Sequence, residues 1–444
     1  MLAENSSVPA IRKAVQRINQ IASERRSLKL VRECHRLLSV RAEANSPAIA
    51  QSIINEIAEL TESEQDALFD ALAREFSPDP KAVLKAAESY AATPNASTLA
   101  ALSNIAEPPR QELFRRLNRA PGGTAALVGL RRQMLRRLAK NPEWQSAEAD
   151  MLHLLSSWFN PGFLQMRRVD WNSPAHLLEQ IIQHEAVHAV DGWDDLRRRL
   201  QPDRRCFAFF HPQLADVPLI FVEVALVAAM PDAIAPLIDK NSEITPPKQF
   251  RVAAFYSISN CEPGLRGVSL GNFLIKRVAE ELKRELPQLK TFCTLSPIPG
   301  FMNWLTRVDN SLAYEGLKPA PRKRLDEALT TLRKATDNDL HALSREAVLT
   351  ALNKDAHEAL LALASAYLIH ESPRSGGDPV ARFHLDNGAK LERINARANV
   401  SAKGLKQSAG LMVNYLYDLE RVEQSHEDFV NGTVTHARAV SGLI

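Results

Sequence analysis

The chain has 444 residues, of which 45% are hydrophobic and 24% are charged. These proportions are typical of globular proteins and exclude disordered, collagen-like and low-complexity chains, and the length suits two or three domains. The net charge is only +3, and no part of the chain carries the basic excess of a nucleic-acid-binding protein.

Cysteine usage and hydropathy indicate the compartment. The four cysteines are far apart and form no C-x-x-C pair, which is typical of a reducing compartment. No run of 18 apolar residues exists and no secretory signal is evident, so we expect no membrane partner. Residues 9–41 are rich in arginine, as in a mitochondrial transit peptide, but the acidic residues among them favour an ordinary surface helix.

The first 150 residues are predicted to be helical throughout. Only three of the 17 glycines lie there, and apolar residues recur at steps of three and four, as in 63–72. Prolines and the Pro121-Gly122-Gly123 turn separate the helices. We expect this part to pack or to oligomerise, because no chemistry is evident in it.

The composition changes near residue 151. Ser173 and Pro174 predict the N-cap and first residue of a helix that extends to about Leu200. Four strands are predicted after it, at 206–210, 218–226, 250–260 and 290–296. A glycine-bearing loop and a helix separate the last two, which indicates an α/β or α+β class. Residues 316–370 return to helix, and 381–444 mix short strands and helices.

The glycine-bearing loop is the strongest local signal. It contains Arg266, Gly267, Val268, Ser269, Leu270, Gly271 and Asn272. Glycines expose backbone N–H groups to an anion, and the helix that follows adds partial positive charge at its N-terminus. The spacing matches neither the dinucleotide-binding nor the P-loop pattern. Two interpretations stay open: a pyrophosphate site, or a tight turn that needs glycine for its geometry alone.

His184, Glu185 and His188 match the H-E-x-x-H pattern within the helix predicted after Ser173. On a helix the two histidines would share a face, and the glutamate could act as general base beside a zinc ion. No third ligand stands out at the expected distance. We therefore favour an ordinary helix with two histidines and keep zinc as a distant alternative.

Two further residues are candidates for polar chemistry. Ser296 ends a predicted strand before Pro297 and Pro299, which fix the backbone, so its hydroxyl could bond a substrate. Alternatively it ends the strand and caps a helix through Trp304. His384 could transfer a proton near neutral pH, although a lone histidine is more often structural. The G-x-S-x-G motif of serine hydrolases is absent.

Several stretches together resemble malonyl-CoA decarboxylases. They include the motifs Ser-Pro-Ile-Pro-Gly-Phe, from Ser296, and His-x-x-Asn-Gly-Ala, from His384. The matching segments follow one another in order, at 158–164, 203–212, 218–226, 255–260, 267–278, 295–301 and 410–415. Residues 1–150 match in helical character more than in motif.

The resemblance implies an α+β fold in two domains. The first, residues 1–150, would be a helical oligomerisation domain, and the protein a homotetramer. The second, residues 151–444, would be an acyl-CoA-binding catalytic domain with a mixed sheet like that of the Gcn5-related N-acetyltransferases. A helical insertion at about 316–370 would interrupt it. The family's acyl-CoA loop falls on 266–272. With no C-terminal peroxisomal signal, a cytoplasmic protein is expected.

The resemblance also assigns roles. Ser296 and His384 fall on the family's two catalytic positions, and Tyr417 on a supporting tyrosine. The expected reaction converts malonyl-CoA to acetyl-CoA and carbon dioxide, with His384 protonating the thioester enolate. Ser296 would contact the thioester oxygen or the malonyl carboxylate, and the family account makes it the proton acceptor. The thioester is the electron sink, so no cofactor or metal is expected. An acyl-CoA-dependent N-acyltransferase, a zinc peptidase and a non-catalytic scaffold are the alternatives.

Overall fold

The structure is a computed structural model that describes residues 7–39, 46–268, 270, 274–308, 317–374 and 376–444. The chain forms two compact units. The first comprises residues 1–164 with 211–215 and 262–269, and the second comprises 165–210, 216–261 and 270–444. Within the described residues, no helix combines the length and the hydrophobicity needed to cross a bilayer.

The N-terminal region is helical, as predicted. Its helices are α1 (Ser7–Leu38), α2 (Ser46–Ala58), α3 (Glu62–Arg74), α4 (Pro80–Ala92), α5 (Ala96–Ala106), α6 (Pro109–Asn118), α7 (Gly123–Arg137) and α8 (Gln145–Trp158). Apart from α4 and α5, these helices contribute their apolar faces to one core, in which the rings of Phe69 and Trp144 meet edge to face. A capping box starts α3, because the side chains and backbone N–H groups of Thr61 and Glu64 bond reciprocally.

The α4–α5 hairpin differs from the other helices of this unit. Only Ala86 of α4 is buried, and α5 buries no residue. Leu84 and Leu99 are 61% and 47% exposed, and Ile105 is also exposed. The two helices pack on each other, and the shared core contains neither of them. The hairpin thus leaves apolar side chains in contact with solvent.

The second unit is built on a mixed sheet in the order β1-β2-β3-β4-β5-β8-β6, with β7 also paired to β8. The strands are β1 (Gln165–Val169), β2 (Arg204–Phe210), β3 (Ile220–Val227), β4 (Val252–Asn260), β5 (Thr291–Thr294), β6 (Ser296–Pro297), β7 (Lys390–Asn395) and β8 (Met412–Leu416). Neighbours from β1 to β4 are antiparallel, whereas β4 and β5 are parallel. Helix α12 (Leu274–Glu285) connects these two strands, as a parallel crossover requires.

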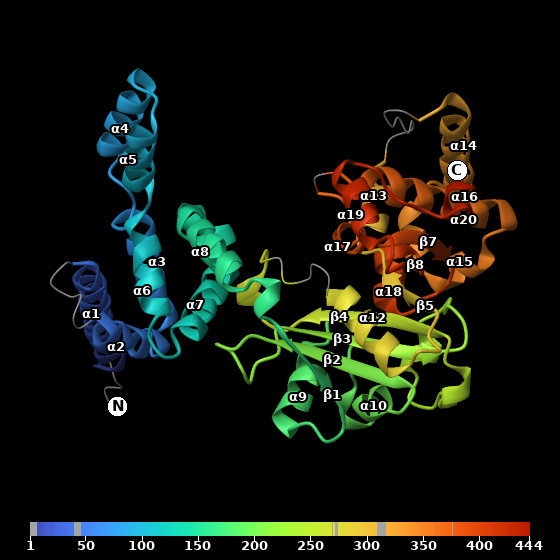
Figure 1. Ribbon diagram of the computed structural model, residues 1–444, viewed down its shortest axis with the longest axis horizontal. Helices are drawn as coiled ribbons and strands as arrows, with labels where there is room; N and C mark the ends of the chain where they lie inside the picture. Colours follow the sequence, from blue (N-terminus) through green and yellow to red (C-terminus); the bar gives the residue numbers. More distant parts are fainter. Residues whose placement is uncertain (1–6, 40–45, 269, 271–273, 309–316, 375) are drawn as a thin grey trace, which may run out of the picture. The chain divides into compact units, whose positions relative to one another are not determined.

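Helices cover both faces of this sheet (Figure 1). On one face, α9 (Ala175–His184) and α10 (Gly192–Arg199) bury apolar side chains against Ala208 and Phe210 of β2. Phe209 points to the opposite face because side chains alternate along a strand. There the guanidinium of Arg277, on α12, lies over the Phe209 ring at 5.6 Å.

One helix prediction made from the sequence is wrong. The segment from Ser173 to Leu200 forms two helices, α9 and α10, and residues 185–191 between them are not helical. Pro174, not Ser173, is the N-cap residue of α9, and the Ser173 hydroxyl accepts the N–H of Asp170 instead. The break follows from Glu185, whose carboxylate accepts backbone N–H groups of the loop and thereby stabilises a turn.

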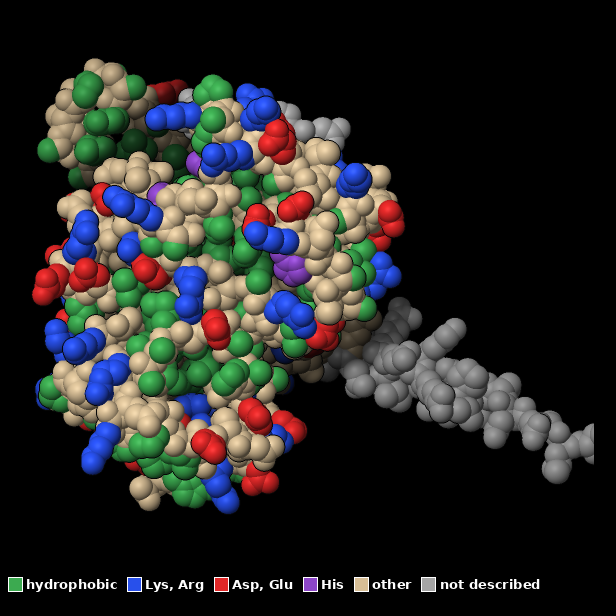
Figure 2. Space-filling view, turned by 90° about the vertical axis from the view of Figure 1, so that its right-hand side faces the viewer, with side chains coloured by type: hydrophobic (Ala, Val, Ile, Leu, Met, Phe, Trp, Pro, Cys, Tyr) green, Lys and Arg blue, Asp and Glu red, His purple; other side chains and the backbone are tan. Residues whose placement is uncertain are grey.

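The C-terminal part carries the predicted helical segment and further short elements. The remaining helices are α11 (Ala235–Ile238), α13 (Phe301–Leu305), α14 (Pro319–Ala335), α15 (Glu346–Ala351), α16 (Lys354–Ala366), α17 (Pro379–Asp386), α18 (Ala402–Ser408), α19 (Val422–Val430) and α20 (Arg438–Ser441). A π-helical turn, Tyr367–Glu371, extends α16. All four cysteines are buried and none forms a disulfide. On the face shown in Figure 2, basic and acidic side chains are interspersed, in keeping with the small net charge.

Candidate active site

Ser296 lies where the fifth strand is interrupted. Strand β5 ends at Thr294, and β6 resumes at Ser296 in register with Val413 of β8. Pro297 and Pro299 then end the strand, since proline has no N–H to donate to a sheet. The alternative that Ser296 caps the following helix is wrong, because α13 begins after Gly300 and has no side-chain cap.

His384 lies in the last turn of α17. Asp378 starts this helix as its N-cap, with Pro379 in the first turn. Asn387 ends it, donating its side-chain amide to the Phe383 carbonyl at 2.7 Å. Gly388 then adopts a φ of +76°, and a Cβ there would lie 2.0 Å from the Val422 carbonyl oxygen. The Asn-Gly pair after the histidine therefore has a structural reason.

The structure brings Ser296, His384 and Tyr417 together. The Ser296 hydroxyl oxygen lies 2.9 Å from His384 Nε2, and the Tyr417 hydroxyl oxygen lies 2.9 Å from His384 Nδ1. Ser296 also donates its single hydroxyl proton to Thr294 Oγ1 at 2.9 Å. Its oxygen must then accept from His384, so Nε2 carries the hydrogen. The lone pair on Nδ1 accepts the Tyr417 hydroxyl proton.

This cluster is buried. The exposed fractions of Ser296, His384 and Tyr417 are 5%, 4% and 2%. Burial lowers the pKa of His384 to about 3, so the imidazole is neutral at physiological pH. Burial also raises the pKa of Tyr417 well above its usual range, which keeps the phenol protonated. The Tyr415 ring stacks on the imidazole with centroids 4.6 Å apart.

Sequence reasoning missed two residues that support this cluster. Thr294 accepts the Ser296 hydroxyl and also the Tyr415 backbone N–H, at 3.3 Å. Asn414 is fully buried and donates to the Thr294 carbonyl at 2.9 Å, across the interruption between β5 and β6. Thr294 could have been found from its position two residues before Ser296, because alternate residues share a face. Asn414 is a polar residue within an otherwise apolar strand, which is a comparable signal.

The structure describes only part of the glycine-bearing loop 266–272. Ser269, Gly271 and Asn272 lie outside them, and Leu270 is buried. Gly267 has a φ of +85°, which explains the glycine by backbone geometry. The Arg266 and Val268 N–H groups donate to carbonyls within the turn, at Pro263 and Leu265. In the described part of the loop, the exposed Arg266 side chain is the cation available to an anion.

A buried arginine anchors this loop within the first unit. Arg131, on α7, is 1% exposed and pairs with Glu148 of α8 at 2.6 Å. Its guanidinium also donates to the carbonyl oxygens of Gly264 and Arg266, at 2.6 and 2.7 Å. These bonds satisfy the arginine and fix the loop backbone within the 3₁₀ turn Pro263–Leu265 and directly after it.

We expect Arg131→Met to lower the free energy of unfolding by about 3–5 kcal/mol, because it leaves the Glu148 carboxylate and two loop carbonyls without their partner. Urea denaturation measures this change. Arg132→Met is the matched control: Arg132 is 42% exposed, and its ion pair with Glu262 should contribute no more than about 1 kcal/mol. Equal losses in the two variants would contradict the anchoring role.

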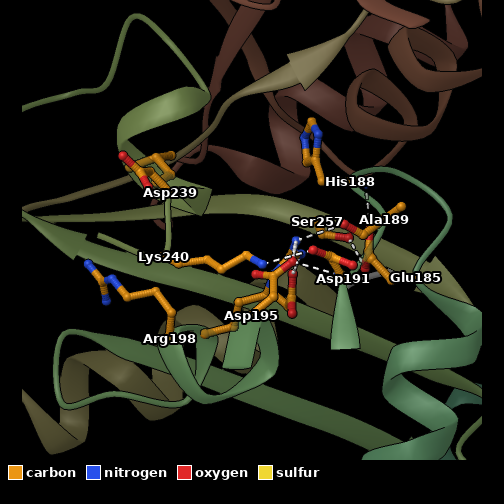
Figure 3. A network of polar contacts seen from close by, with 12 residues as sticks. Glu185, His188, Ala189, Asp191, Asp195, Arg198, Asp239, Lys240 and Ser257 are labelled. Carbon is orange, nitrogen blue, oxygen red and sulfur yellow. Dashed lines mark hydrogen bonds and ion pairs between the residues drawn. The ribbon is translucent and has the colours of Figure 1, made fainter. Parts of the chain in front are cut away.

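The H-E-x-x-H residues do not share a helix. His184 is the last residue of α9, Glu185 follows as its C-cap, and His188 lies in the loop before α10. The Glu185 carboxylate accepts the Ser257 and Ser259 hydroxyls of β4 at 2.6 and 3.1 Å. In Figure 3 the His188 ring points away from this carboxylate. The geometric basis of the zinc alternative is therefore absent, and no group of three potential metal ligands occurs among the described residues.

The same region holds a buried ion-pair network (Figure 3). Arg199 bonds Asp195 at 3.0 Å and Glu223 at 3.0 Å, and all three side chains are buried. Burial raises the pKa of Glu223 to about 8 despite the nearby guanidinium. Burial also lowers the pKa of His188 to about 3. Arg199 also donates to the Ala189 carbonyl at 3.2 Å, so the network joins α10, the loop before it and the sheet, which is a structural role for the segment.

The N-terminal helices, the mixed sheet and the buried serine–histidine–tyrosine cluster define an α+β protein with a polar site typical of an enzyme. The family model "Malonyl-CoA decarboxylase C-terminal domain" matches residues 162–444, and the corresponding N-terminal model matches 76–159. The chain therefore belongs to the malonyl-CoA decarboxylase family.

Individual relatives agree with this assignment. The crystal structure of malonyl-CoA decarboxylase from Rhodopseudomonas palustris is 46% identical, with a TM-score of 0.79, and the match covers 94% of this chain and 99% of that one. The Agrobacterium vitis structure is 44% identical with the same TM-score and coverage. The mitochondrial malonyl-CoA decarboxylase of the goose, Anser anser anser, is 38% identical over 70% of this chain. That match spans only 64% of the goose protein.

Proposed function

We propose that this protein decarboxylates malonyl-CoA to acetyl-CoA and carbon dioxide. The observation that carries the proposal is the buried pair of Ser296 and His384, 2.9 Å apart, in a chain of this family. We further propose that residues 151–444 form the catalytic domain and adopt the Gcn5-related N-acetyltransferase type of fold. The antiparallel strands β1–β4, followed by the parallel pair β4–β5 across α12, support this type.

The reaction consumes one proton, and we assign its transfer to His384. In the resting site the imidazole is neutral and holds its hydrogen on Nε2, facing Ser296. The malonyl carboxylate, once bound nearby, favours the charged form of the ring, because an opposite charge raises the pKa of a histidine. After carbon dioxide leaves, Nε2 gives its proton to the α-carbon of the thioester enolate. The imidazole thereby returns to its neutral state.

Ser296 orients the substrate in this mechanism. Its hydroxyl can rotate from Thr294 to the thioester oxygen, where negative charge accumulates as the carbon–carbon bond breaks. Donors directed at such an oxygen contribute about 3–4 kcal/mol to the barrier in comparable sites. Tyr417 holds the ring from the other side, and its hydroxyl can accept from Nδ1 when the imidazole is charged.

We propose that the loop 266–272 binds the pyrophosphate of coenzyme A. The exposed Arg266 side chain and the helix that begins at Leu274 support this assignment. Gly267, with its positive φ, shapes the described part of the loop. In this proposal the loop contacts phosphate rather than the malonyl group.

We expect Gly267→Val to raise the KM for malonyl-CoA about tenfold, because a left-handed conformation costs a β-branched residue about 1–2 kcal/mol. The value of kcat should stay nearly constant. Gly432→Val is the matched control, since Gly432 also has a positive φ, of +84°. Apart from its chain neighbours, no heavy atom of the described residues lies within 4 Å of the position that a Cβ would take there. Steady-state kinetics of both variants measure the difference. A fall in kcat at unchanged KM would contradict the assignment.

An acyl-CoA-dependent N-acyltransferase on the same fold is the second candidate. Incubation of the purified protein with malonyl-CoA and no acceptor separates the two functions. Decarboxylation requires carbon dioxide and acetyl-CoA in equal amounts. Unchanged malonyl-CoA, consumed only when an amine is added, would support the transferase instead.

We also propose that residues 1–150 mediate self-association, as a homotetramer. The exposed apolar side chains of the α4–α5 hairpin support association, because a partner that covered them would remove apolar surface from water. Analytical ultracentrifugation tests the state. A cytoplasmic location is proposed from the sequence, although the vertebrate relatives are named mitochondrial, and cell fractionation tests it.

A further inference from the structure

Asp378 is a buried carboxylate with four hydrogen-bond donors around it. The residue is 1% exposed. One oxygen, Oδ1, accepts the backbone N–H groups of Val380 and Ala381, each at 3.0 Å. The other, Oδ2, accepts the Gly300 N–H at 2.8 Å and the Tyr367 hydroxyl at 3.4 Å. The two oxygens therefore bond different segments of the chain.

Those two segments carry Ser296 and His384, the two proposed catalytic residues. Gly300 follows Ser296 by four residues, in the loop that both prolines stiffen. Asp378 precedes His384 by six residues and caps the helix on which the histidine lies. We propose that Asp378 is a positioning residue, which holds the Ser296 loop and the His384 helix at the separation that the reaction requires. This inference rests on the function proposed above.

The packing around Gly300 supports this role independently. A Cβ at Gly300 would lie 2.2 Å from the Tyr367 hydroxyl oxygen and 3.2 Å from Asp378 Oδ2. Tyr367 begins the π-helical turn, and such turns are frequent at functional sites. Its ring packs against Phe301 and Trp304, with centroids 5.7 and 5.1 Å away. The loop can approach the carboxylate this closely only because residue 300 is glycine.

The geometric requirement is strict. Displacement of a reacting group by about 1 Å can reduce a rate about a hundredfold. In this site one carboxylate spans the serine loop and the histidine helix. Loss of either half of its contacts would leave both elements folded but would no longer fix their distance.

The test uses Asp378→Asn and Asp378→Ser in the full chain. Asparagine and serine are good N-cap residues, so both variants should keep the start of α17. An asparagine cannot accept from Gly300 and from the helix N–H groups with one oxygen, and a serine is too short to reach both. We expect kcat for malonyl-CoA to fall about ten- to a hundredfold, with KM within about twofold of wild type.

A second readout does not depend on activity. Diethyl pyrocarbonate modifies accessible histidines, and peptide mass spectrometry reports the rate at His384. This rate should rise in both variants because the buried imidazole is no longer held against Ser296. The matched control is Asp79→Asn, which changes the same residue type in another Asp-Pro N-cap, at α4. It should alter neither the kinetics nor the modification rate.

The outcomes are distinct. Lower kcat, unchanged KM and faster His384 modification in the variants support the positioning role. Wild-type kinetics and an unchanged modification rate overturn it, as does the failure of both variants to fold, since the proposal requires an intact fold with altered site geometry. If the wild type itself releases no carbon dioxide, the proposed function fails, and the modification rate still decides whether Asp378 positions His384.

Discussion

Replacement of His384 by alanine is expected to lower kcat for malonyl-CoA by about a hundred- to ten-thousandfold, the range attributed to a positioned acid–base group. The variant should still bind coenzyme A, because the histidine bonds Ser296 and Tyr417 and is not part of the loop assigned to pyrophosphate. Single-turnover release of labelled carbon dioxide measures the loss. Isothermal titration with coenzyme A measures binding.

His384→Gln sharpens this test. Glutamine can still donate a hydrogen bond to Ser296 but cannot carry a titratable proton. It should therefore be as slow as alanine. Recovery of activity with glutamine would mean that the side chain only orients Ser296, and near-normal activity with alanine would assign the proton to Tyr417. His341→Ala, at an exposed histidine of the same unit, is the control and should be neutral.

Ser296→Ala should reduce kcat about a hundred- to a thousandfold, as removal of a single donor to a developing oxyanion does in comparable enzymes. The Nε2–H of His384 also loses its acceptor. Because Ser296 is proposed to contact the reacting group, the loss should appear in kcat and in kcat/KM to a similar degree. Steady-state assays over a range of malonyl-CoA concentrations measure both constants.

A control for this serine is available in the same unit. The Ser365 hydroxyl is fully buried and donates to the Val440 carbonyl at 2.8 Å. Ser365→Ala removes an equivalent buried hydroxyl without touching the candidate site, so it should lower stability by about 1 kcal/mol and leave kcat unchanged. If both variants lost activity equally, a general packing defect would explain the result, and the role of Ser296 would have to be withdrawn.

The main elements of the fold could be predicted because their signals are local. Steps of three and four predicted the N-terminal helices, and apolar runs predicted strands β2 to β5 within a few residues. The helix from Ser173 to Leu200 failed because a tertiary contact overrode the local pattern. Glu185 bonds Ser257 and Ser259, which lie more than 70 residues away, and a periodicity cannot reveal such a partner.

The candidate site was only partly predictable. Ser296 and His384 were each ambiguous alone, because a strand-ending serine and a lone histidine usually have structural roles. Their motifs identified them through the family resemblance, and the structure adds the contact between them. Asp378 was missed because its significance depends on a hydrogen bond to Gly300, 78 residues away along the chain.

The burial that keeps His384 neutral has a thermodynamic consequence for the whole chain. His384 and His188 both have a pKa of about 3 in the folded protein, against about 6.5 for an unfolded histidine. As the pH falls below about 6.5, these two histidines bind protons in the unfolded chain but stay neutral in the folded chain. Each histidine then lowers the free energy of unfolding by about 1.4 kcal/mol per pH unit. Tolerance of acid is thus limited by the same residue that is proposed to supply the proton for catalysis.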